Sequence, residues 1–355
     1  MSPFWLRSAP ASGATRFFSD AALADVRQFY QSTPDAVATP LRHFRGLAAE
    51  LGLRDVLIKD ETSRFGLPAF KIAGARYAVA RLVEGRRHAV GDLACATAGN
   101  HGRAVAYAGR LHGRGVHVYV PARTAASRVN ALRAEGADVV ITRVGYDETV
   151  RLMARDAADR GWIIVSDTAW PGYEEIPRAI MAGYTWLMDE AAAQWNELPP
   201  DVVIVQAGVG SLAGAVAGWL QHCPGPRLVI VEPVGSACVQ ASLRAGKRVT
   251  LKTCGPTPMV GLRCAEVSTI SWPVLESVVD AAIGVPDSLA SDAIQRLAWP
   301  AARDDALITT AASGAAGLAG LLALAHDPDL APIRTALRIG PTTRVMVIVT
   351  EGQTA

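Results

Sequence analysis

The sequence predicts an α/β protein in which mostly parallel sheets carry helices on both faces. Short apolar runs alternate with longer segments whose apolar residues recur at helical spacing. Several of these runs pass through a glycine-rich turn directly into a helical segment, which is typical of β-α units with crossover connections. With 355 residues, half of them hydrophobic, the chain is long enough for two domains with separate cores.

The alternation can be followed along most of the chain. A strand is expected at 55–61, and two strand–turn–helix units are expected at 94–113 and 201–220. Further strands are expected at 116–121, 137–142, 162–167, 227–233 and 344–352, and helices at 127–136, 146–161 and 176–195. Asp147 is a candidate N-cap for the second of these helices, and Gly161 is its expected end.

Composition and charge exclude several classes of function. The formal net charge is +2 and the arginines are scattered, so a nucleic-acid-binding surface is not expected. The sequence shows neither a membrane-spanning segment nor the apolar core of a signal peptide. Five cysteines, an odd number without paired spacing, predict reduced thiols and no zinc site. We therefore expect a cytoplasmic protein without a bound metal.

One lysine stands out because it lies among small and apolar residues. Lys71 follows Phe70 and precedes Ile72 in the stretch GLPAFKIAGARYAVARL. A lysine at a helix start commonly lays its stem on apolar surface and keeps its ammonium group in water. Alternatively, burial disfavours the charged form, so that a desolvated lysine becomes a nucleophile able to form a Schiff base. The other motifs decide between these interpretations.

The first glycine-rich turn, GVGSLAG, begins at Gly208 after an apolar run and opens a helical segment. Its backbone amides, with the positive end of the helix dipole, form an anion site. Gly208, Gly210 and Ala213 match the pattern G-x-G-x-x-A of a dinucleotide site, for which Glu232 would be the acidic residue. The turn can instead hold one phosphate monoester with help from Ser211, or merely allow tight packing.

Two further turns carry small polar residues. The turn TAGNHG, residues 97–102, also joins an apolar run to a helical segment, so its amides can hold a carboxylate. Asn100 can donate to a ring hydroxyl or serve only as a turn residue, and His101 is more typical of packing or capping than of direct chemistry. The third turn, TEGQT, begins at Thr350 near the C-terminal end, with AASGAAG upstream, and either faces a ligand or simply turns the chain.

One cofactor accounts for all these features together. A nicotinamide-dependent oxidoreductase would use the turn at Gly208 but leave Lys71 and TAGNHG without a role. Pyridoxal phosphate needs a lysine for its aldehyde and an amide-rich helix start for its phosphate, and its amino-acid substrates need a second such site for their carboxylate.

The order AFKIAGA, TAGNHG, AGVGSLAG and VEP resembles that of the tryptophan synthase β-like, fold-type II pyridoxal-phosphate enzymes over nearly the whole chain. Within this group the chain is most similar to the diaminopropionate ammonia-lyases, through DETSRFGLPAFKIAGARYA, residues 146–184, PMVGL and TEGQT. The resemblance implies a homodimer whose subunits have two parallel-sheet domains with the cofactor in the cleft between them. Residues 1–91 and 195–355 would form the large pyridoxal-phosphate-binding domain, and residues 92–194 the small substrate-carboxylate domain; the proline-rich residues 196–201 lie near this boundary.

The resemblance also implies roles for single residues. Lys71 matches the Schiff-base lysine that removes the substrate Cα proton, and Asp167 matches an acidic catalytic residue near the substrate. Thr350, or Ser313 in its place, would face the pyridine nitrogen. The cofactor phosphate would be held by Gly208, Val209, Gly210, Ser211 and Leu212. The substrate carboxylate would be held by Thr97, Ala98, Gly99, Asn100 and His101, and Asn100 would also lie near the phenolate oxygen of the cofactor.

Several positions depart from the ammonia-lyase pattern. Ala98 stands where those enzymes carry an aspartate that serves as the second acid/base for the D-enantiomer. Its loss removes a proton carrier from the face opposite Lys71 and favours strict L-stereospecificity. This chain also differs from the ammonia-lyase pattern at Ala265 and Val267, which follow Cys264, and at Ala312, Val349 and Gln353. These changes indicate either a changed substrate or intermediate, or ordinary drift with intact activity.

The resulting prediction is an α,β-eliminating lyase. It would remove ammonia or water from a β-substituted amino acid such as 2,3-diaminopropionate, through aminoacrylate, and give a 2-oxo acid and ammonia. A β-replacement synthase of a specialised pathway, which captures the same aminoacrylate with a second nucleophile, is one alternative. A serine/threonine dehydratase-like enzyme, a non-catalytic binding protein on the same scaffold and the oxidoreductase are the others.

Overall fold

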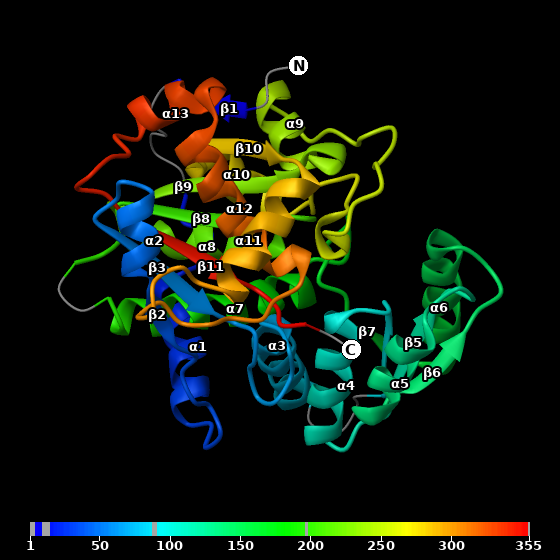
Figure 1. Ribbon diagram of the computed structural model, residues 1–355. Helices are drawn as coiled ribbons and strands as arrows, with labels where there is room; N and C mark the ends of the chain where they lie inside the picture. Colours follow the sequence, from blue (N-terminus) through cyan, green and yellow to red (C-terminus); the bar gives the residue numbers. More distant parts are fainter. Residues whose placement is uncertain (1–3, 9–14, 87–90, 196–197, 354–355) are drawn as a thin grey trace.

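Two sheets organise the structure, a computed structural model that describes residues 4–8, 15–86, 91–195 and 198–353 (Figure 1). The larger sheet has seven strands in the order β1-β10-β9-β8-β11-β3-β2. Its inner pairs are parallel, and both edge strands run antiparallel to their neighbours. The strands are β1 (Phe4–Leu6), β2 (Leu41–His43), β3 (Asp55–Asp60), β8 (Val202–Gln206), β9 (Arg227–Pro233), β10 (Ala281–Val285) and β11 (Arg344–Val349).

The smaller sheet has four strands in the order β6-β5-β4-β7, and all its pairs are parallel. Its strands are β4 (Leu93–Ala96), β5 (Val116–Val120), β6 (Asp138–Ile141) and β7 (Ile163–Ile164). With α4 (Asn100–Leu111), α5 (Ala126–Ala134) and α6 (Tyr146–Arg160) it forms the cyan-to-green group at the right of Figure 1. The predicted α/β class with mostly parallel sheets is thus confirmed.

Helices cover both faces of the larger sheet because its strands are apolar on both sides. On β3, Leu57 packs into one buried cluster while Val56 and Ile58 pack into another, as the two-residue repeat of a strand requires. The helices are α1 (Asp20–Gln31), α2 (Arg45–Glu50), α3 (Lys71–Arg86), α7 (Glu175–Ala193), α8 (Ser211–Leu220), α9 (Cys238–Ala245), α10 (Ser271–Val278), α11 (Asp287–Ala298), α12 (Ala312–His326) and α13 (Ala331–Ala336). Short 3-10 turns lie at η1 (Val234–Ser236), η2 (Val260–Leu262) and η3 (Pro328–Leu330).

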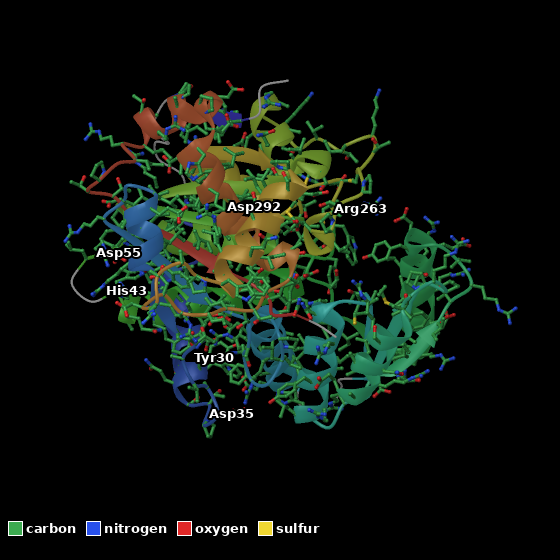
Figure 2. The ribbon with its side chains drawn as sticks, viewed as in Figure 1. Tyr30, Asp35, His43, Asp55, Arg263 and Asp292 are labelled. Atoms are coloured by element: carbon green, nitrogen blue, oxygen red, sulfur yellow. The ribbon has the colours of Figure 1, made fainter. Side chains whose placement is uncertain are left out.

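The edge strand β2 is tied to β3 by side chains as well as by its ladder. His43 Nδ1 at the end of β2 lies 3.0 Å from Asp55 Oδ2 at the start of β3, and both residues are labelled at the left of Figure 2. None of the described helices is both long enough and apolar enough to cross a membrane.

Helix α7 packs closely on α3. A Cβ atom at Gly183 of α7 would lie 2.6 Å from the carbonyl oxygen of Ala73, and one at Gly74 of α3 would lie 2.4 Å from the ring of Tyr184. Both glycines are therefore needed for this close approach. Helix α7 belongs to the 92–194 segment but packs on helices of the larger sheet, whereas the smaller sheet itself lies within residues 93–164. The proposed domain division stays a prediction.

Two local predictions need correction. The N-cap of α6 is Gly145, not Asp147, which lies in the first helical turn, where its charge still favours the helix dipole. Gly161 ends this helix as predicted, with a φ of 67°. The strand predicted at 162–167 is reduced to the two residues of β7, because the chain then leaves the sheet and carries Asp167 into the site described below. Of the proline-rich boundary at 196–201, residues 196 and 197 lie outside the described part of the chain.

Candidate active site

Lys71 is the first residue of α3 and lies beside the end of β11. The amide of Phe70 donates to the carbonyl oxygen of Thr350 at 3.2 Å, and Ala69 forms a backbone bridge with Glu351. The helix start is therefore pinned to the strand whose C-terminal end carries TEGQT. Two of the motifs recognised in the sequence meet here.

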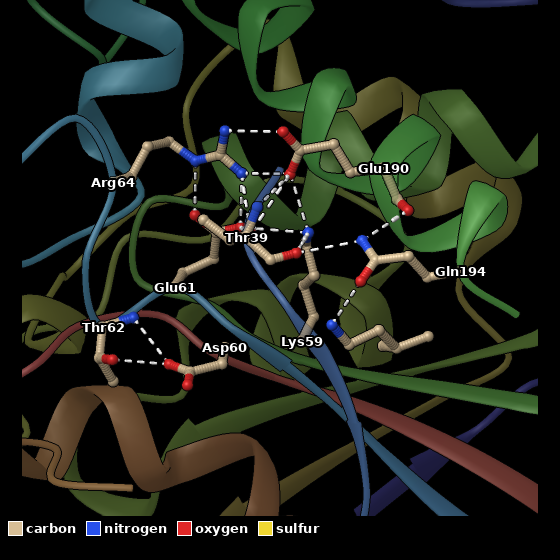
Figure 3. A network of polar contacts seen from close by, with 9 residues as sticks. Thr39, Lys59, Asp60, Glu61, Thr62, Arg64, Glu190 and Gln194 are labelled. Carbon is tan, nitrogen blue, oxygen red and sulfur yellow. Dashed lines mark hydrogen bonds and ion pairs between the residues drawn. The ribbon is translucent and has the colours of Figure 1, made fainter. Parts of the chain in front are cut away.

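A buried ionic network fixes the loop that leads from β3 to Lys71 (Figure 3). Arg64 of this loop donates to Glu61 at 2.7 Å and to Glu190 of α7 at 2.6 Å. Lys59 of β3 donates to the same Glu190 oxygen at 2.8 Å, and Thr39 completes the network through Glu61 and Lys59. Two positive and two negative side chains, all almost fully buried, thus compensate one another.

The ammonium group of Lys71 forms an ion pair with Asp167. Its Nζ lies 2.5 Å from Asp167 Oδ2, and the two side chains are 25% and 18% exposed. Burial alone would lower the pKa of Lys71, but attraction by Asp167 and Tyr184 outweighs it and raises that pKa above its usual range. Burial likewise opposes the charge of Asp167, yet the charge of Lys71 and its hydrogen bond hold the pKa of Asp167 below the usual range. Both partners are therefore charged at neutral pH.

His101 is the third member of this cluster. Its Nε2 is placed to donate to the carbonyl oxygen of Val165 at 2.9 Å. Its Nδ1 lies 3.9 Å from Asp167 Oδ2 and is buried without a hydrogen-bond partner. Burial lowers the pKa of His101, so the ring is neutral and Nδ1 is an acceptor facing the ion pair. His101 thus both packs and faces the site.

The turn at Gly208 lies close to Asp167 and has the geometry of an anion cradle. A Cβ atom at Gly208 would lie 2.9 Å from the carbonyl oxygen of Gly261, and Gly210 has a φ of 89°, so side chains are excluded at both positions. Ser211 opens α8 and donates its hydroxyl to the Asp167 carbonyl oxygen at 2.5 Å. The amides of the first helical turn, including that of Leu212, have no intrahelical partner and are available to an anion. Val209 lies within the turn, and its carbonyl oxygen accepts a hydrogen bond from the Ser268 amide.

The turn 97–101 brings a second helix start, that of α4, to the same region. Gly99 is the N-cap, and its amide donates to Thr97 Oγ1 at 3.2 Å. Asn100 donates through Nδ2 to Glu351 Oε2 at 2.7 Å, while Ala98 packs against the hydrophobic core. The side chain at position 98 is a methyl group, so this turn carries no carboxylate there.

The candidates for the pyridine nitrogen occupy the ends of β11 and α12. Thr350 Oγ1 accepts from Gln206 Nε2 at 2.9 Å, which leaves its own hydroxyl hydrogen to donate elsewhere. Ser313 Oγ accepts from the Gly261 amide at 3.0 Å. Two of the departures, Ala312 and Val349, belong to the apolar cluster between the sheet and α12.

Two findings go beyond the sequence-based prediction. Glu351 was not recognised as a site residue, although it directly follows Thr350 at the end of a strand that meets the Lys71 segment. Glu232 is not available to a ribose, because its two carboxylate oxygens accept from the Val239 and Gln240 amides at 2.8 and 2.7 Å. The dinucleotide interpretation is therefore wrong.

The assembled groups fit a phosphorylated aldehyde cofactor. They offer an amine at Lys71, a cradle at Gly208 and Gly210 that side chains cannot enter, and an unpartnered acceptor at His101. Among the described residues, no three His, Cys, Asp or Glu side chains come together as ligands for a metal ion.

Comparison with known proteins gives the same cofactor. The family described as "Pyridoxal-phosphate dependent enzyme" matches residues 33–350. Diaminopropionate ammonia-lyase of Escherichia coli K12 is 37% identical over 358 residues, which cover 95% of this chain and 90% of that protein. The crystal structure of the E. coli enzyme with an aminoacrylate-PLP azomethine reaction intermediate superimposes with a TM-score of 0.90 at 35% identity, over 99% of this chain and 94% of that one. Its complex with D-serine also gives a TM-score of 0.90, at 34% identity and the same coverage of 99% and 94%.

Proposed function

The chain belongs to the family of pyridoxal-phosphate-dependent enzymes, and on this premise we propose that it is a carbon–nitrogen lyase that eliminates ammonia from 2,3-diaminopropionate. One observation carries the proposal. The Lys71–Asp167 ion pair lies next to the glycine cradle, in a chain 37% identical to a diaminopropionate ammonia-lyase.

We assign the cofactor to the residues that the sequence singled out. Lys71 would bind its aldehyde, the turn from Gly208 to Leu212 its phosphate, Asn100 its phenolate oxygen and Thr350 its pyridine nitrogen. When bound, pyridoxal phosphate supplies a ring system that delocalises the negative charge left when a Cα proton is removed.

Lys71 then acts as the base. A proton taken from Cα onto Nζ is stabilised there, because Asp167 stays ionised and holds the ammonium form of Lys71. The β-nitrogen, bound as an ammonium group, already carries its proton and leaves as ammonia with the electron pair of the Cβ–N bond, so no further proton is delivered to it. The enamine that leaves is hydrolysed by water to the 2-oxo acid and a second ammonia. His101 Nδ1, a buried acceptor without a partner, lies 3.9 Å from Asp167 Oδ2 and would be open to an N–H of the substrate.

The charge balance of the site favours a cationic β-substituent. When the Lys71 nitrogen is bonded to the cofactor, Asp167 loses the ammonium partner it has at 2.5 Å. A buried carboxylate without a partner is costly. The β-ammonium group of 2,3-diaminopropionate can replace that partner, whereas the hydroxyl of serine carries no charge. We therefore expect diaminopropionate to be preferred over serine.

Ala98 supports a further proposal, that the enzyme acts on the L-enantiomer alone. With a methyl group at this position, the turn 97–101 offers no proton carrier on the face opposite Lys71. We predict that Ala98→Asp gains activity on D-2,3-diaminopropionate while the wild type has none above background. Equal activity of the wild type on both enantiomers would contradict this account of stereospecificity.

The test is to purify the protein with pyridoxal phosphate and follow 2-oxo-acid release from the L- and D-isomers separately. Lys71→Ala is expected to abolish turnover, whereas Lys252→Ala, which changes an exposed lysine, is expected to retain it. Spectral change without 2-oxo acid would reject simple elimination and indicate that a second substrate captures the product, as in a β-replacement synthase.

We also propose that the enzyme acts in the cytoplasm as a homodimer. The five free thiols support a reducing compartment, and the resemblance to the fold-type II group supports the dimer. Light scattering coupled to gel filtration tests the oligomeric state, and a monomer of about the chain's mass of 37.4 kDa would contradict it.

A further inference from the structure

Glu351 is a partly buried carboxyl group in the middle of the site, and the mechanism above does not use it. Its main chain is fixed on two sides: Ala69 forms a backbone bridge with it, and Thr310 Oγ1 donates to its carbonyl oxygen at 2.5 Å. The start of α12 leaves room for its side chain because a Cβ atom at Gly314 would lie 3.1 Å from Glu351 Cγ. The position of this carboxyl group is thus built into three segments of the fold.

The carboxyl group faces polar or charged groups from four helices. Asn100 of α4 donates to it at 2.7 Å, and Ser313 of α12 forms a hydrogen bond with it. Two cations act on it, Lys71 of α3 and Arg128 of α5. Burial raises the pKa of Glu351 above its usual range, although these four groups oppose that rise. Glu351 therefore changes charge closer to neutral pH than an exposed glutamate does.

We propose that Glu351 is a positioning residue that acts through Asn100 on the ring edge of the cofactor. The inference rests on the proposed function only in taking Asn100 as a cofactor contact. One N–H of the Asn100 amide is held by Glu351, which leaves the second N–H and the carbonyl oxygen in a fixed orientation. An ionised Glu351 polarises this amide and places a negative charge beside it; a protonated Glu351 does neither.

Because Glu351 acts through Asn100, the absorption spectrum of the enzyme with bound pyridoxal phosphate and without substrate should depend on Glu351. The visible absorption of bound pyridoxal phosphate responds to charge and hydrogen bonding at its ring substituents. We therefore expect a change of absorption with pH that follows Glu351 in the wild type. In Glu351→Gln, which keeps the shape and an acceptor oxygen but cannot ionise, this change of absorption with pH is lost.

The experiment is a double-mutant cycle read from spectra without substrate. Spectra of the wild type, Glu351→Gln, Asn100→Ala and the double variant, all loaded with pyridoxal phosphate, are recorded from pH 5 to pH 10. Glu276→Gln, which removes an exposed carboxylate on α10, is the matched control. The proposal predicts that Glu351→Gln alters the spectra while the control does not, and that the alteration disappears in the Asn100→Ala background.

Two results would overturn it. Spectra of Glu351→Gln that superimpose on those of the wild type at every pH would show that the ring does not sense Glu351. An equal alteration in both backgrounds would show that the effect does not pass through Asn100. Should Glu351→Gln fail to fold, Glu351→Asp takes its place in the cycle, because it withdraws the carboxylate from Asn100 without removing the charge. Because no substrate is present, these outcomes do not depend on which amino acid the enzyme consumes.

Discussion

Replacing Asp167 by asparagine should change two properties of Lys71 in opposite directions. The Asp167→Asn variant keeps the shape of the side chain and removes the charge 2.5 Å from Lys71 Nζ. A hydrogen bond to a charged group contributes about 1.5–3 kcal/mol. Since about 1.4 kcal/mol corresponds to one pKa unit or to a tenfold change in rate, the pKa of Lys71 should fall by roughly one to two units.

Turnover and cofactor uptake report these two changes. The variant should lose roughly 10- to 100-fold in kcat, because a proton on Nζ is no longer stabilised by a carboxylate. The cofactor-free variant should take up pyridoxal phosphate roughly 10- to 100-fold faster at neutral pH, because more of Lys71 is the uncharged amine that attacks the aldehyde. Uptake is followed by visible absorbance after mixing, and kcat by 2-oxo-acid release.

The matched control is Asp292→Asn, which removes an exposed carboxylate from α11 (Figure 2) and should leave both rates unchanged. A variant that lost turnover and also took up the cofactor more slowly would refute the reasoning. That result would mean that Asp167 places Lys71 rather than holding its proton.

Three further predictions concern stability and cofactor binding. Glu190→Gln leaves Lys59 and Arg64 with one carboxylate between them, so the free energy of unfolding in denaturant should fall by about 3 kcal/mol. An unchanged denaturation midpoint would contradict the stabilising role of the buried network in Figure 3. Gly210→Ala places a side chain at a φ of 89° and 2.9 Å from Leu275 Cδ1, so the free energy of unfolding should fall by about 1–2 kcal/mol. The same variant should bind pyridoxal phosphate more weakly in a titration, and an unchanged affinity would argue against the cradle. Burial raises the pKa of Glu232 to about 8, so its protonated form stabilises the fold at low pH and this contribution is lost as pH rises from the ordinary glutamate range through about 8. Relative to Glu232→Gln, the wild type should therefore lose unfolding free energy over that range, and parallel pH curves would contradict the assignment.

The regular elements were predictable because local patterns specify them. Both glycine turns that open α4 and α8 lie where strand, turn and helix signals follow one another within a few residues. The cap of α6 was mispredicted because Asp147 and Gly145 are both reasonable caps, and the backbone placed the helix start one residue before the aspartate. The shortness of β7 depends on where the chain must go next, which no local pattern records.

The site could be predicted only in part, because its contacts join residues far apart in sequence. Lys71 and the cradle carry local signals, whereas Asp167 has none and was found through the resemblance. Glu351 was overlooked because a glutamate after a strand has no distinctive pattern. Its place in the site is evident only from the pairing of β11 with β3, which brings the ends of both strands to the start of α3 and to Asn100.

The most direct test of the central claim is the ratio of ammonia to 2-oxo acid released from L-2,3-diaminopropionate. Elimination followed by hydrolysis consumes one water and gives one pyruvate and two ammonia molecules. We predict this ratio of two to one with the wild type and no release with Lys71→Ala. Ammonia released without pyruvate, or consumption of the amino acid without either product, would contradict the proposal that this chain is an ammonia-eliminating lyase.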